Sequence, residues 1–410
     1  MKTKAVIIIG GGASGLIAAI LIAREGGTVT LLEQNSRIGK KILVSGNGKC
    51  NIGNRNITPR CFHSQNPPFV ESTLKGYGFA KIETFFHSIG LALIEGREGK
   101  IFPMSMQASS VTEILEYEAR EAGVEIICDA PVETVRVEKG FFTIESAKGR
   151  FSAYKLLLAS GSPAAPQLGG SLGGLKLAED LGHTLLPVYP SLVQLCSEEQ
   201  WVRAASGVKI EGIVKLYANG EYIIEKRGDL LFTNYGISGL AILDISREVS
   251  LRLADYAYCE LQLDLMPEWT REQLNRLLLS HLHKGARKPL VLWLQGMLNK
   301  KLIPIVLEQS GTKAKKEGDL NRKEIGRLVY ALKNLKLSIS GTRGFKGAEV
   351  ATGGIDTTEV DAETMVSRKV PGLYFAGEIL DVDGDRGGFN FHFAWTSGMR
   401  AAEAIVDNGE

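Results

Sequence analysis

The segment AVIIIGGGASGLIAAILIA, residues 5–23, limits the possible fold more than any other part of this 410-residue chain. Ser14 is its only clearly polar side chain, and about 20 apolar residues are enough to cross a lipid bilayer. Glycines interrupt the segment, however, and each one costs a helix interior about 1 kcal/mol relative to alanine. A secretion signal would need a small-residue cleavage site after its apolar core, whereas a strand with an acidic end follows here. We therefore reject both a membrane span and a secretion signal.

The same segment matches the order strand, tight turn, helix, strand. Residues 6–9 are a run of β-branched side chains, which favours a buried strand. Apolar residues then recur at helical spacing as far as Ala23. Residues 28–32 form a second apolar run, after a Gly-Gly turn. This order is typical of the first part of a parallel α/β domain.

Three glycines and one acid in this unit have separate physical roles. Gly10, Gly12 and Gly15 stand in G-x-G-x-x-G spacing, and Glu33 follows about 20 residues later, as in dinucleotide-binding units. The first glycine permits the turn, the second lets a pyrophosphate approach the backbone, and the third lets helix and strand pack closely. Free amides and the dipole at the helix start attract phosphates. We expect Glu33 to accept hydrogen bonds from a ribose.

Composition and cysteine spacing narrow the class of protein. The chain exceeds the size of one hydrophobic core, so we expect two or three domains. A net charge of +2 gives no overall case for a nucleic acid or a membrane as partner. The five cysteines form no C-x-x-C pair, which favours the cytoplasm and excludes flavoenzymes that pass electrons through paired cysteines. The six histidines have no Cys or carboxylate cluster beside them, so we expect no metal site.

Apolar periodicity assigns further elements to the first half of the chain. Residues 37–56, RIGKKILVSGNGKCNIGNRN, are rich in Gly, Asn and Lys and predict a loop. We expect one helix over residues 69–90 and a second over residues 110–122, each with one apolar face. Strands should follow within residues 124–160, with a turn at Lys139-Gly140. The last of these strands is expected to return to the first sheet.

The pattern changes from about Pro190. Residues 208–234 alternate at period two around Asn219-Gly220, which predicts a hairpin within a small antiparallel barrel or sandwich. Residues 270–335 are helical in pattern and basic. We interpret these cations as a solvated face rather than as a site for an anionic ligand or partner. The basic side chains are Lys284, Arg287, Lys288, Lys300, Lys301, Lys313, Lys315, Lys316, Arg322 and Lys323.

The C-terminal segment returns to α/β character. Residues 373–376 predict a strand, followed by an acidic glycine-rich loop and a helix from about Phe389. Since a nicotinamide dehydrogenase needs only one nucleotide-binding unit, a second glycine loop favours an extended ligand with two ends, FAD. The first unit would hold the adenosine. Backbone amides of residues 387–390 would then lie beside the flavin N1 and C2 carbonyl, and Glu378 would accept from the ribityl chain.

The predicted fold class is therefore α/β. A Rossmann-like FAD-binding domain, residues 1–189 and 342–410, carries an inserted antiparallel β-barrel and a helical subdomain. The inserted β domain comprises residues 190–268, and the helical part comprises residues 269–341.

Four motifs carry a resemblance to a known family. They are SGNGKCN at 45–51, EGREGKIFPMSMQA at 95–108, LLFTNYGISGLAIL at 230–243 and PGLYFAGEILDVDGDRGGFNFHFAWTSG at 371–398. With these motifs in order along essentially the whole chain, the sequence resembles the BaiN/aminoacetone-oxidase-like flavoprotein family. The resemblance implies an FAD domain built from both chain ends, with an inserted barrel and helical domain. It also implies either an NAD(P)H-linked reductase of unsaturated steroid or bile-acid ketones, or an amine oxidase.

The chain departs from the family pattern at several positions. Ser160-Gly161 stands where the family commonly has Gly-Gly, and His392 replaces a usual Gln. Asn234 and Leu240 replace the usual His and Pro of the middle motif. Residues 169–180, GGSLGGLKLAED, lack an Asp and a Tyr that are often found there. We expect FAD binding to survive these changes, whereas they weaken any transfer of the family's substrates.

The candidate catalytic residues are Lys49, Cys50 and His392. Lys49 would stabilise reduced flavin, whereas Cys50 has no resolving partner, so we favour a packing role for it over a redox role. His392 is a candidate general acid, and a hydrogen-bonded structural histidine is an equal alternative. The residues expected to bind FAD are Gly10, Gly12, Ala13, Ser14, Gly15, Glu33, Lys40, Lys41, Gly48, Lys49, Cys50, Asn51, Val132, Ser160, Gly161, Gly377, Glu378, Gly387, Gly388, Phe389 and Asn390.

Three functions follow from these observations. The first is an FAD-dependent oxidoreductase that reduces a small or steroid-like unsaturated ketone. Its donor would be NAD(P)H visiting the flavin directly, since no second G-x-G-x-x-G follows a predicted strand. The alternatives are an amine oxidase that uses oxygen, and a non-enzymatic flavin-bearing RNA-binding or sensor protein suggested by the basic helices. We favour a small-molecule substrate in the cytoplasm of a bacterium, without a membrane or nucleic-acid partner.

Overall fold

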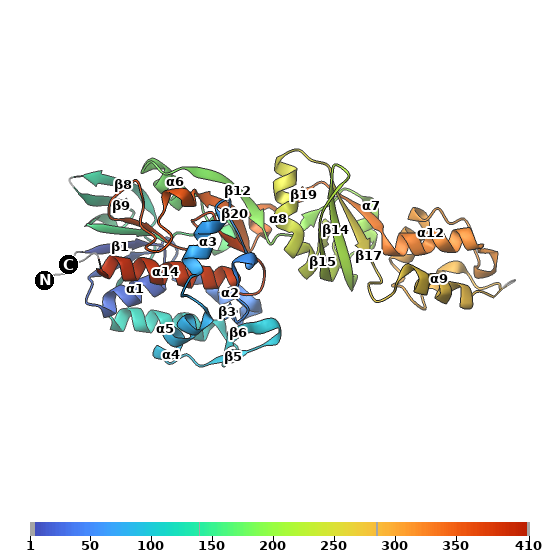
Figure 1. The fold of residues 1–410 in the computed structure, drawn as a ribbon, viewed down its shortest axis with the longest axis horizontal. Coiled ribbons are helices and arrows are strands. Elements are labelled where there is room, and N and C mark those ends of the chain that lie inside the picture. Colours follow the sequence, from blue (N-terminus) through green and yellow to red (C-terminus); the bar gives the residue numbers. More distant parts are fainter. Residues whose placement is uncertain (1–4, 139, 284–285, 408–410) are drawn as a thin grey trace. The chain divides into compact units, whose positions relative to one another are not determined.

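The computed structural model describes residues 5–138, 140–283 and 286–407 (Figure 1). Its internal contacts divide the chain into two compact units, one of residues 1–189 and 349–410, the other of residues 190–348. We refer to these as the first and the second unit. Two residues named above, Lys139 of the predicted turn and Lys284 of the basic segment, lie outside the described residues.

A parallel sheet forms the centre of the first unit. Its strand order is β21-β11-β1-β2-β7, and every neighbouring pair is parallel. All four residues of the central strand are buried, which explains why its sequence is uniformly apolar rather than alternating. The predicted strands are thereby confirmed. Their bounds are β1 Val6–Ile9, β2 Val29–Leu32, β7 Glu125–Ile127, β11 Lys155–Leu158 and β21 Leu373–Phe375.

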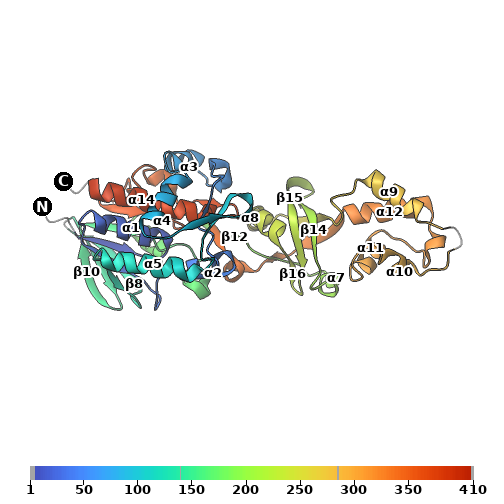
Figure 2. The ribbon, with the colours of Figure 1, turned by 90° about the horizontal axis from the view of Figure 1, so that it is seen from below.

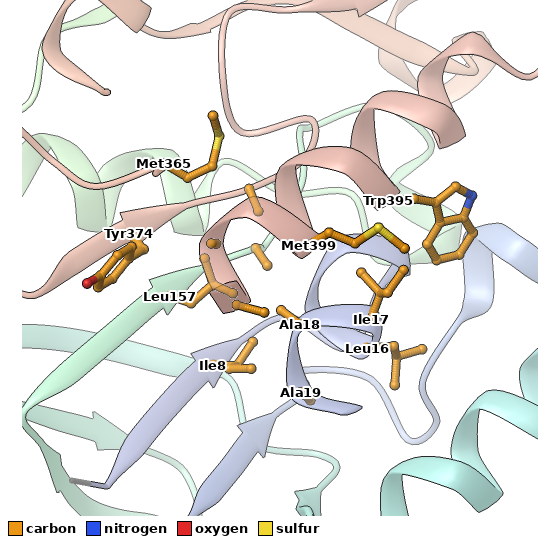
Figure 3. Close-up of a cluster of buried hydrophobic side chains, with 14 of the residues drawn as sticks. Ile8, Leu16, Ile17, Ala18, Ala19, Leu157, Met365, Tyr374, Trp395 and Met399 are labelled. Carbon is orange, nitrogen blue, oxygen red and sulfur yellow. The ribbon is translucent and has the colours of Figure 1, made fainter. Parts of the chain in front are cut away.

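Helices from opposite ends of the sequence pack on each other beside this sheet. Helix α1 (Ala13–Arg24) and helix α14 (Phe389–Asp407) lie side by side in both ribbon views (Figures 1 and 2). A Cβ at Gly398 would come within 2.5 Å of the Ser14 carbonyl oxygen and 2.6 Å of the Ile17 side chain. Figure 3 shows Ile17 and Met399 in the apolar contact between the helices, above β1 and β11. The two ends of the chain therefore share one core.

Two local predictions in the first unit are wrong. The predicted loop over residues 37–56 contains a helix, α2 (Lys40–Gly48), whose backbone leaves helical geometry from Ser45 to Asn47. The single helix predicted over residues 69–90 is two, α3 (Pro67–Leu74) and α4 (Phe79–Ser88), because Gly76 between them takes a φ of +79°. The other elements of this unit are β3 Gly53–Asn54, β4 Phe62–His63, β5 Leu93–Glu95, β6 Lys100–Pro103, α5 Ala108–Glu121, β8 Val132–Glu138, β9 Phe141–Ser146, β10 Gly149–Ala153, α6 Gly173–Asp180, β12 Leu185–Ser191, β20 Val350–Ile355 and β22 Asp383–Gly384.

The second unit is built on a seven-stranded antiparallel sheet of order β18-β17-β14-β15-β16-β13-β19. The predicted hairpin is confirmed, because Asn219 and Gly220 join β14 to β15 with φ angles of +50° and +86°. Closure of the sheet into a barrel stays a prediction. The strands are β13 Leu195–Cys196, β14 Lys209–Ala218, β15 Glu221–Phe232, β16 Gly236–Ser238, β17 Cys259–Asp264, β18 Leu335–Ile339 and β19 Gly341–Thr342.

The helices of the second unit confirm the helical pattern of residues 270–335. Capping boxes at Thr270 and Asn321 begin the two longer helices of this segment, α9 and α12. The helical segment lies between strands β17 and β18 of one sheet, and β19 pairs with β13. The contacts therefore end this unit at residue 348, a few residues after the boundary expected from the sequence. The helices are α7 Gln200–Ala204, α8 Leu240–Ala254, α9 Arg271–Ser280, α10 Leu290–Leu294, α11 Ile303–Gln309, α12 Arg322–Lys333 and α13 Gly344–Gly347.

No helix within the described ranges combines the length and the apolar character that crossing a bilayer requires.

Candidate functional site

The glycine turn between β1 and α1 has the geometry of a phosphate cradle. A Cβ at Gly10 would lie 2.4 Å from the Ala159 carbonyl oxygen, and one at Gly15 would lie 1.9 Å from the carbonyl oxygen of Gly10. Packing therefore fixes the first and third glycines. At Gly12, by contrast, no atom of the described residues comes within 4 Å of an added Cβ. This open space lies directly before the first turn of α1, where free amides and the helix dipole favour a phosphate.

Glu33 holds its carboxylate beside this turn. The side chain is 7% exposed, and Oε2 accepts a hydrogen bond of 2.8 Å from the Gly11 amide. Oε1 accepts from the amide and the side-chain nitrogen of Asn35, at 2.8 and 2.6 Å. The carboxylate is therefore fixed at the end of β2, and its oxygens keep further lone pairs that a ribose hydroxyl group can use. The ribose contact itself stays a prediction.

The returning strand β11 and the start of β8 lie close to the same turn. Gly10 contacts the backbone of Ala159 and Ser160 so closely that a side chain would not fit between them. Ser160 Oγ is buried without a hydrogen-bond partner in the described part of the chain. The Ala130 amide donates to the Glu33 carbonyl oxygen at 2.9 Å, which brings the start of β8, Val132, toward the adenosine end.

The loop after β21 joins the C-terminal segment to the glycine turn. Gly377 takes a φ of +77°, and a Cβ there would lie 2.6 Å from Ser14 Oγ on α1. Farther along, Gly387 and Gly388 take φ angles of +136° and +99° immediately before α14. A Cβ at Gly388 would lie 2.9 Å from Asn51 Oδ1, an acceptor that is buried and unpartnered among the described residues. The SGNGKCN segment thus lies against the start of α14, as the proposed flavin end requires.

Helix α2 bears the two predicted lysines, and they have different partners. Lys40 Nζ donates to Asn35 Oδ1 at 2.9 Å, next to the Glu33 carboxylate. Lys41 Nζ forms an ion pair of 2.9 Å with Glu378 Oε2, in the loop after β21. Glu378 Oε1 also accepts from Ser162 Oγ at 2.7 Å. Helix α2 therefore connects the adenosine end of the predicted site to the ribityl end.

The surroundings of Cys50 support the packing role. Its side chain is fully buried, and this burial raises the pKa of the thiol to about 12, although a hydrogen bond with Ser45 opposes the rise. A thiol needs its thiolate form to act as a nucleophile or redox group, so Cys50 is unreactive near neutral pH. Gly48 and Lys49, at the end of α2, are exposed.

His392 has the surroundings of the structural alternative rather than of a general acid. Its side chain is fully buried, and ring atom Nε2 donates to the Tyr77 carbonyl oxygen at 2.8 Å. Burial lowers the pKa of the imidazole to about 4, against the opposing effect of the Tyr77 hydrogen bond. The ring is therefore neutral near pH 7, and its bound proton faces the protein backbone.

Residues that the sequence reasoning missed stabilise the loop before α14. Asn54 Nδ2 donates to the Gly387 carbonyl oxygen at 3.0 Å and to that of Glu98 at 3.1 Å. His63 Nε2 lies 2.9 Å from Asp385 Oδ1. Asn54 closely follows the SGNGKCN motif in the sequence, and this proximity could have predicted that it lies near the site. Nothing in the local sequence pairs His63 with a residue 322 positions later.

These residues fit FAD at both ends. The open space at Gly12 and the fixed Glu33 carboxylate suit the pyrophosphate and ribose, and the buried oxygen of Asn51 suits a donor on the flavin ring. The side chain of Asn390, in contrast, binds the amide and carbonyl of Gly384 at 2.8 Å, which leaves its backbone amide for the cofactor. When bound, FAD supplies the hydride chemistry, and the chain orients it.

Comparison with known proteins supports the same class of molecule. Residues 4–404 match the family described as HI0933-like protein Rossmann domain. The chain is 38% identical over 403 residues to the 3-dehydro-bile acid delta(4,6)-reductase of Clostridium scindens, covering 98% of each sequence. It is 32% identical over 406 residues to the ribosomal RNA dihydrouridine synthase of Haemophilus influenzae, covering 97% of this chain and 98% of the relative. Among solved structures, the 3-ketosteroid delta1-dehydrogenase of Sterolibacterium denitrificans has the same fold, with a TM-score of 0.54, 12% identity and full coverage of both chains.

Proposed function

Because the chain belongs to the HI0933-like protein family and is an FAD-dependent oxidoreductase, we propose that it reduces a carbon–carbon double bond conjugated to a carbonyl group. The names of both relatives support this reaction. A delta(4,6)-reductase of a 3-dehydro bile acid and a dihydrouridine synthase each imply hydrogen added across such a bond. The reductase is the more similar of the two, at 38% against 32% identity, so a small or steroid-like unsaturated ketone is the substrate we favour.

The observation that carries this proposal is the cradle made by both chain ends. The turn at Gly12 is open to a pyrophosphate, and the start of α14 lies against Asn51 at the other end. The free amides at the start of α14 favour the negative charge that a flavin ring gains on reduction. Lys49 is exposed at the end of α2, and its positive charge would stabilise the same negative charge.

NADH or NADPH is the electron donor in this proposal. The sequence holds one G-x-G-x-x-G turn after a strand, and FAD uses it. The nicotinamide would therefore visit the flavin directly and leave before the ketone binds. We place the reaction in the cytoplasm of a bacterium, since the cysteine spacing suits a reducing compartment.

Anaerobic stopped-flow spectroscopy of the purified yellow protein tests the proposal. Rapid loss of flavin absorbance on mixing with NADPH or NADH, followed by its return with an unsaturated ketone, is the expected result. An amine oxidase that uses oxygen is the alternative from a different substrate class. It would be supported if neither nucleotide bleached the flavin, and if an amine such as aminoacetone both bleached it and released peroxide in air.

One surface of the second unit favours a second candidate substrate, an RNA base. In the described part of residues 270–335, twelve Lys and Arg residues are exposed, against three exposed acids, Glu272, Glu308 and Asp319. Two further acids, Glu317 and Glu324, are buried and lie 3.9 and 4.0 Å from Lys288 and Arg327, so each offsets one of these cations. This excess suits a polyanion, although a solvated face remains the simpler alternative. The exposed cations are Arg271, Arg276, Arg287, Lys288, Lys300, Lys301, Lys313, Lys315, Lys316, Arg322, Lys323 and Arg327.

Salt-dependent binding to ribosomal RNA fragments distinguishes the two substrates. If RNA is the substrate, affinity should fall steeply with salt, and replacing Lys313, Lys315 and Lys316 by Ala should weaken it. The same variant should leave the reduction of a free ketone unchanged. RNA affinity equal in parent and variant would favour the solvated face.

A further inference from the structure

The proposed reduction needs a proton as well as a hydride. When a hydride adds to one carbon of a conjugated double bond, the carbon next to the carbonyl must receive a proton. His392 does not suit this step, because it is buried and its proton is held by the Tyr77 carbonyl oxygen. The donor must instead reach a substrate near the proposed flavin end, and it must recover its proton from water.

His63 and Asp385 meet these conditions in the first unit. His63 Nε2 lies 2.9 Å from Asp385 Oδ1, and the two side chains are 36% and 35% exposed. Asp385 stands two residues before Gly387, at the start of the segment whose amides we assign to the flavin. The carboxylate holds Nε2, and the other ring nitrogen, Nδ1, has no hydrogen-bond partner within the described ranges. It can therefore exchange a proton.

Backbone contacts fix this pair in place. Strand β4 pairs with β22 in antiparallel register, and the Asp385 amide donates to the Cys61 carbonyl oxygen at 2.8 Å. The Asn390 side chain, from the first turn of α14, binds both the amide and the carbonyl of Gly384 at 2.8 Å. His63 therefore lies on β4 and Asp385 directly follows β22. The Asn390 side chain joins β22 to the start of α14. Such support is what a proton donor needs to be positioned.

Two buried carboxylates, Asp381 and Asp383, lie close to this pair. Asp383 is the register partner of His63 and is 1% exposed. Asp381, 2% exposed, accepts hydrogen bonds from the Gln65 amide at 2.8 Å and from Ser64 Oγ at 3.3 Å. These two carboxylates are buried, so neither is a source of protons for a bound ketone. His63, by contrast, reaches solvent, with 36% of its side chain exposed.

We propose that His63 is the proton donor of the reduction. This inference rests on the proposed function. FAD, when bound and reduced, would supply a hydride to the carbon farther from the carbonyl, and Nδ1–H of the His63 imidazolium would give its proton to the nearer carbon. The double bond is reduced by two electrons and the flavin is oxidised by two. The neutral ring then recovers its proton from water, and Asp385 acts as a positioning residue that holds Nε2–H.

The test uses the full-length FAD-bound protein, reduced anaerobically with dithionite so that no nicotinamide is needed. The reduced protein is mixed with 4-androstene-3,17-dione, a conjugated steroid ketone, and the return of flavin absorbance is followed. We expect His63→Gln to slow this step by at least about 100-fold, the usual lower limit for loss of a general acid. Asp385→Asn should fall between parent and H63Q. His87→Gln, at an exposed histidine on α4, is the matched control and should leave the rate unchanged.

Two further measurements separate a proton donor from a structural histidine. Added imidazole should restore the rate of His63→Gly, because a diffusing donor replaces the missing ring. In ¹⁵N-labelled oxidised protein, the saturated ketone 5α-androstane-3,17-dione should shift the Nδ1 resonance of His63. FAD affinity should be the same in parent and H63Q.

Two outcomes would overturn the inference in different ways. If the parent is reoxidised rapidly and H63Q matches it, or if imidazole gives no rescue, His63 is not the donor and the proposed function stands. If the steroid ketone does not reoxidise the parent, the proposed function fails for this substrate, and the inference fails with it. The parent alone reveals the second outcome.

Discussion

Replacement of Glu33 by Ala should weaken FAD binding by an amount that follows from its contacts. In the folded protein the carboxylate is fixed by the amides of Gly11 and Asn35 and by the Asn35 side chain. If one oxygen also accepts from the ribose, the variant loses one hydrogen bond to a charged group, about 1.5–3 kcal/mol. Since about 1.4 kcal/mol is a tenfold change, the Kd for FAD should rise about 10- to 150-fold.

Titration of the apoprotein with FAD, followed by quenching of flavin fluorescence, measures this change. The alternative cause of a weaker Kd is local unfolding, because E33A also leaves the buried amides of Gly11 and Asn35 without an acceptor. Asn35→Ala is the matched control, since it removes one contact to the carboxylate but keeps the carboxylate itself. We expect N35A to retain FAD within a few-fold of the parent. An unchanged Kd in E33A would refute the ribose assignment, and an equal loss in N35A would assign the effect to the loop.

Three further predictions concern packing, thiol chemistry and pH. Gly15→Ala should lower the free energy of unfolding and abolish FAD retention, because its Cβ would lie 1.9 Å from a backbone oxygen; urea unfolding and the flavin content of the purified protein measure this, and a yellow variant of parental stability would contradict it. Cys50 should resist iodoacetamide at pH 8 in the folded protein, since burial raises its pKa to about 12; rapid labelling, detected by mass spectrometry, would refute its burial. Glu359 has a pKa lowered to about 2, because hydrogen bonds and charge from Lys369 and Thr184 outweigh its burial. A carboxylate whose pKa is lowered in the folded state stabilises the protein above pH 4.5, and this stabilisation is lost as the pH falls toward 2. Glu359→Gln should therefore lower the free energy of unfolding by about 3 kcal/mol at pH 7 and by little at pH 2. An equal decrease at both pH values in urea titrations would refute this.

The parts of the fold that local sequence determines could be predicted. A buried parallel strand must be apolar on both faces, so residues 6–9 and 156–158 were recognisable without a partner. Asn219-Gly220 fixes its own turn through the φ angles it permits. The same reasoning failed for α2, because Ser45, Gly46 and Asn47 interrupt its helical geometry and its sequence is mostly polar.

The parts of the site that depend on distant contacts could not be predicted in full. Both glycine loops were identified from their spacing, but their close approach through Gly377 and Ser14 is a tertiary contact. The neighbouring lysines 40 and 41 gave no signal that they would bind partners at opposite ends of the site. Burial favours the packing role for Cys50 and the structural role for His392, and a single sequence does not encode burial at one position.

The placement of α14 has a consequence for how this protein is synthesised. The sheet cannot gain β21 until residue 375 has been made, and α1 stays uncovered until residues 389–407 leave the ribosome. Translation proceeds from the N-terminus at about 5–20 residues each second. Because residues 190–348 precede β21 and α14 in the chain, the second unit emerges complete while the first still lacks its last strand and helix. Until residues 389–407 have emerged, the nascent chain therefore lacks the helix that we assign to the flavin end of the site. We expect a chain that ends before Phe389 to be released without bound flavin.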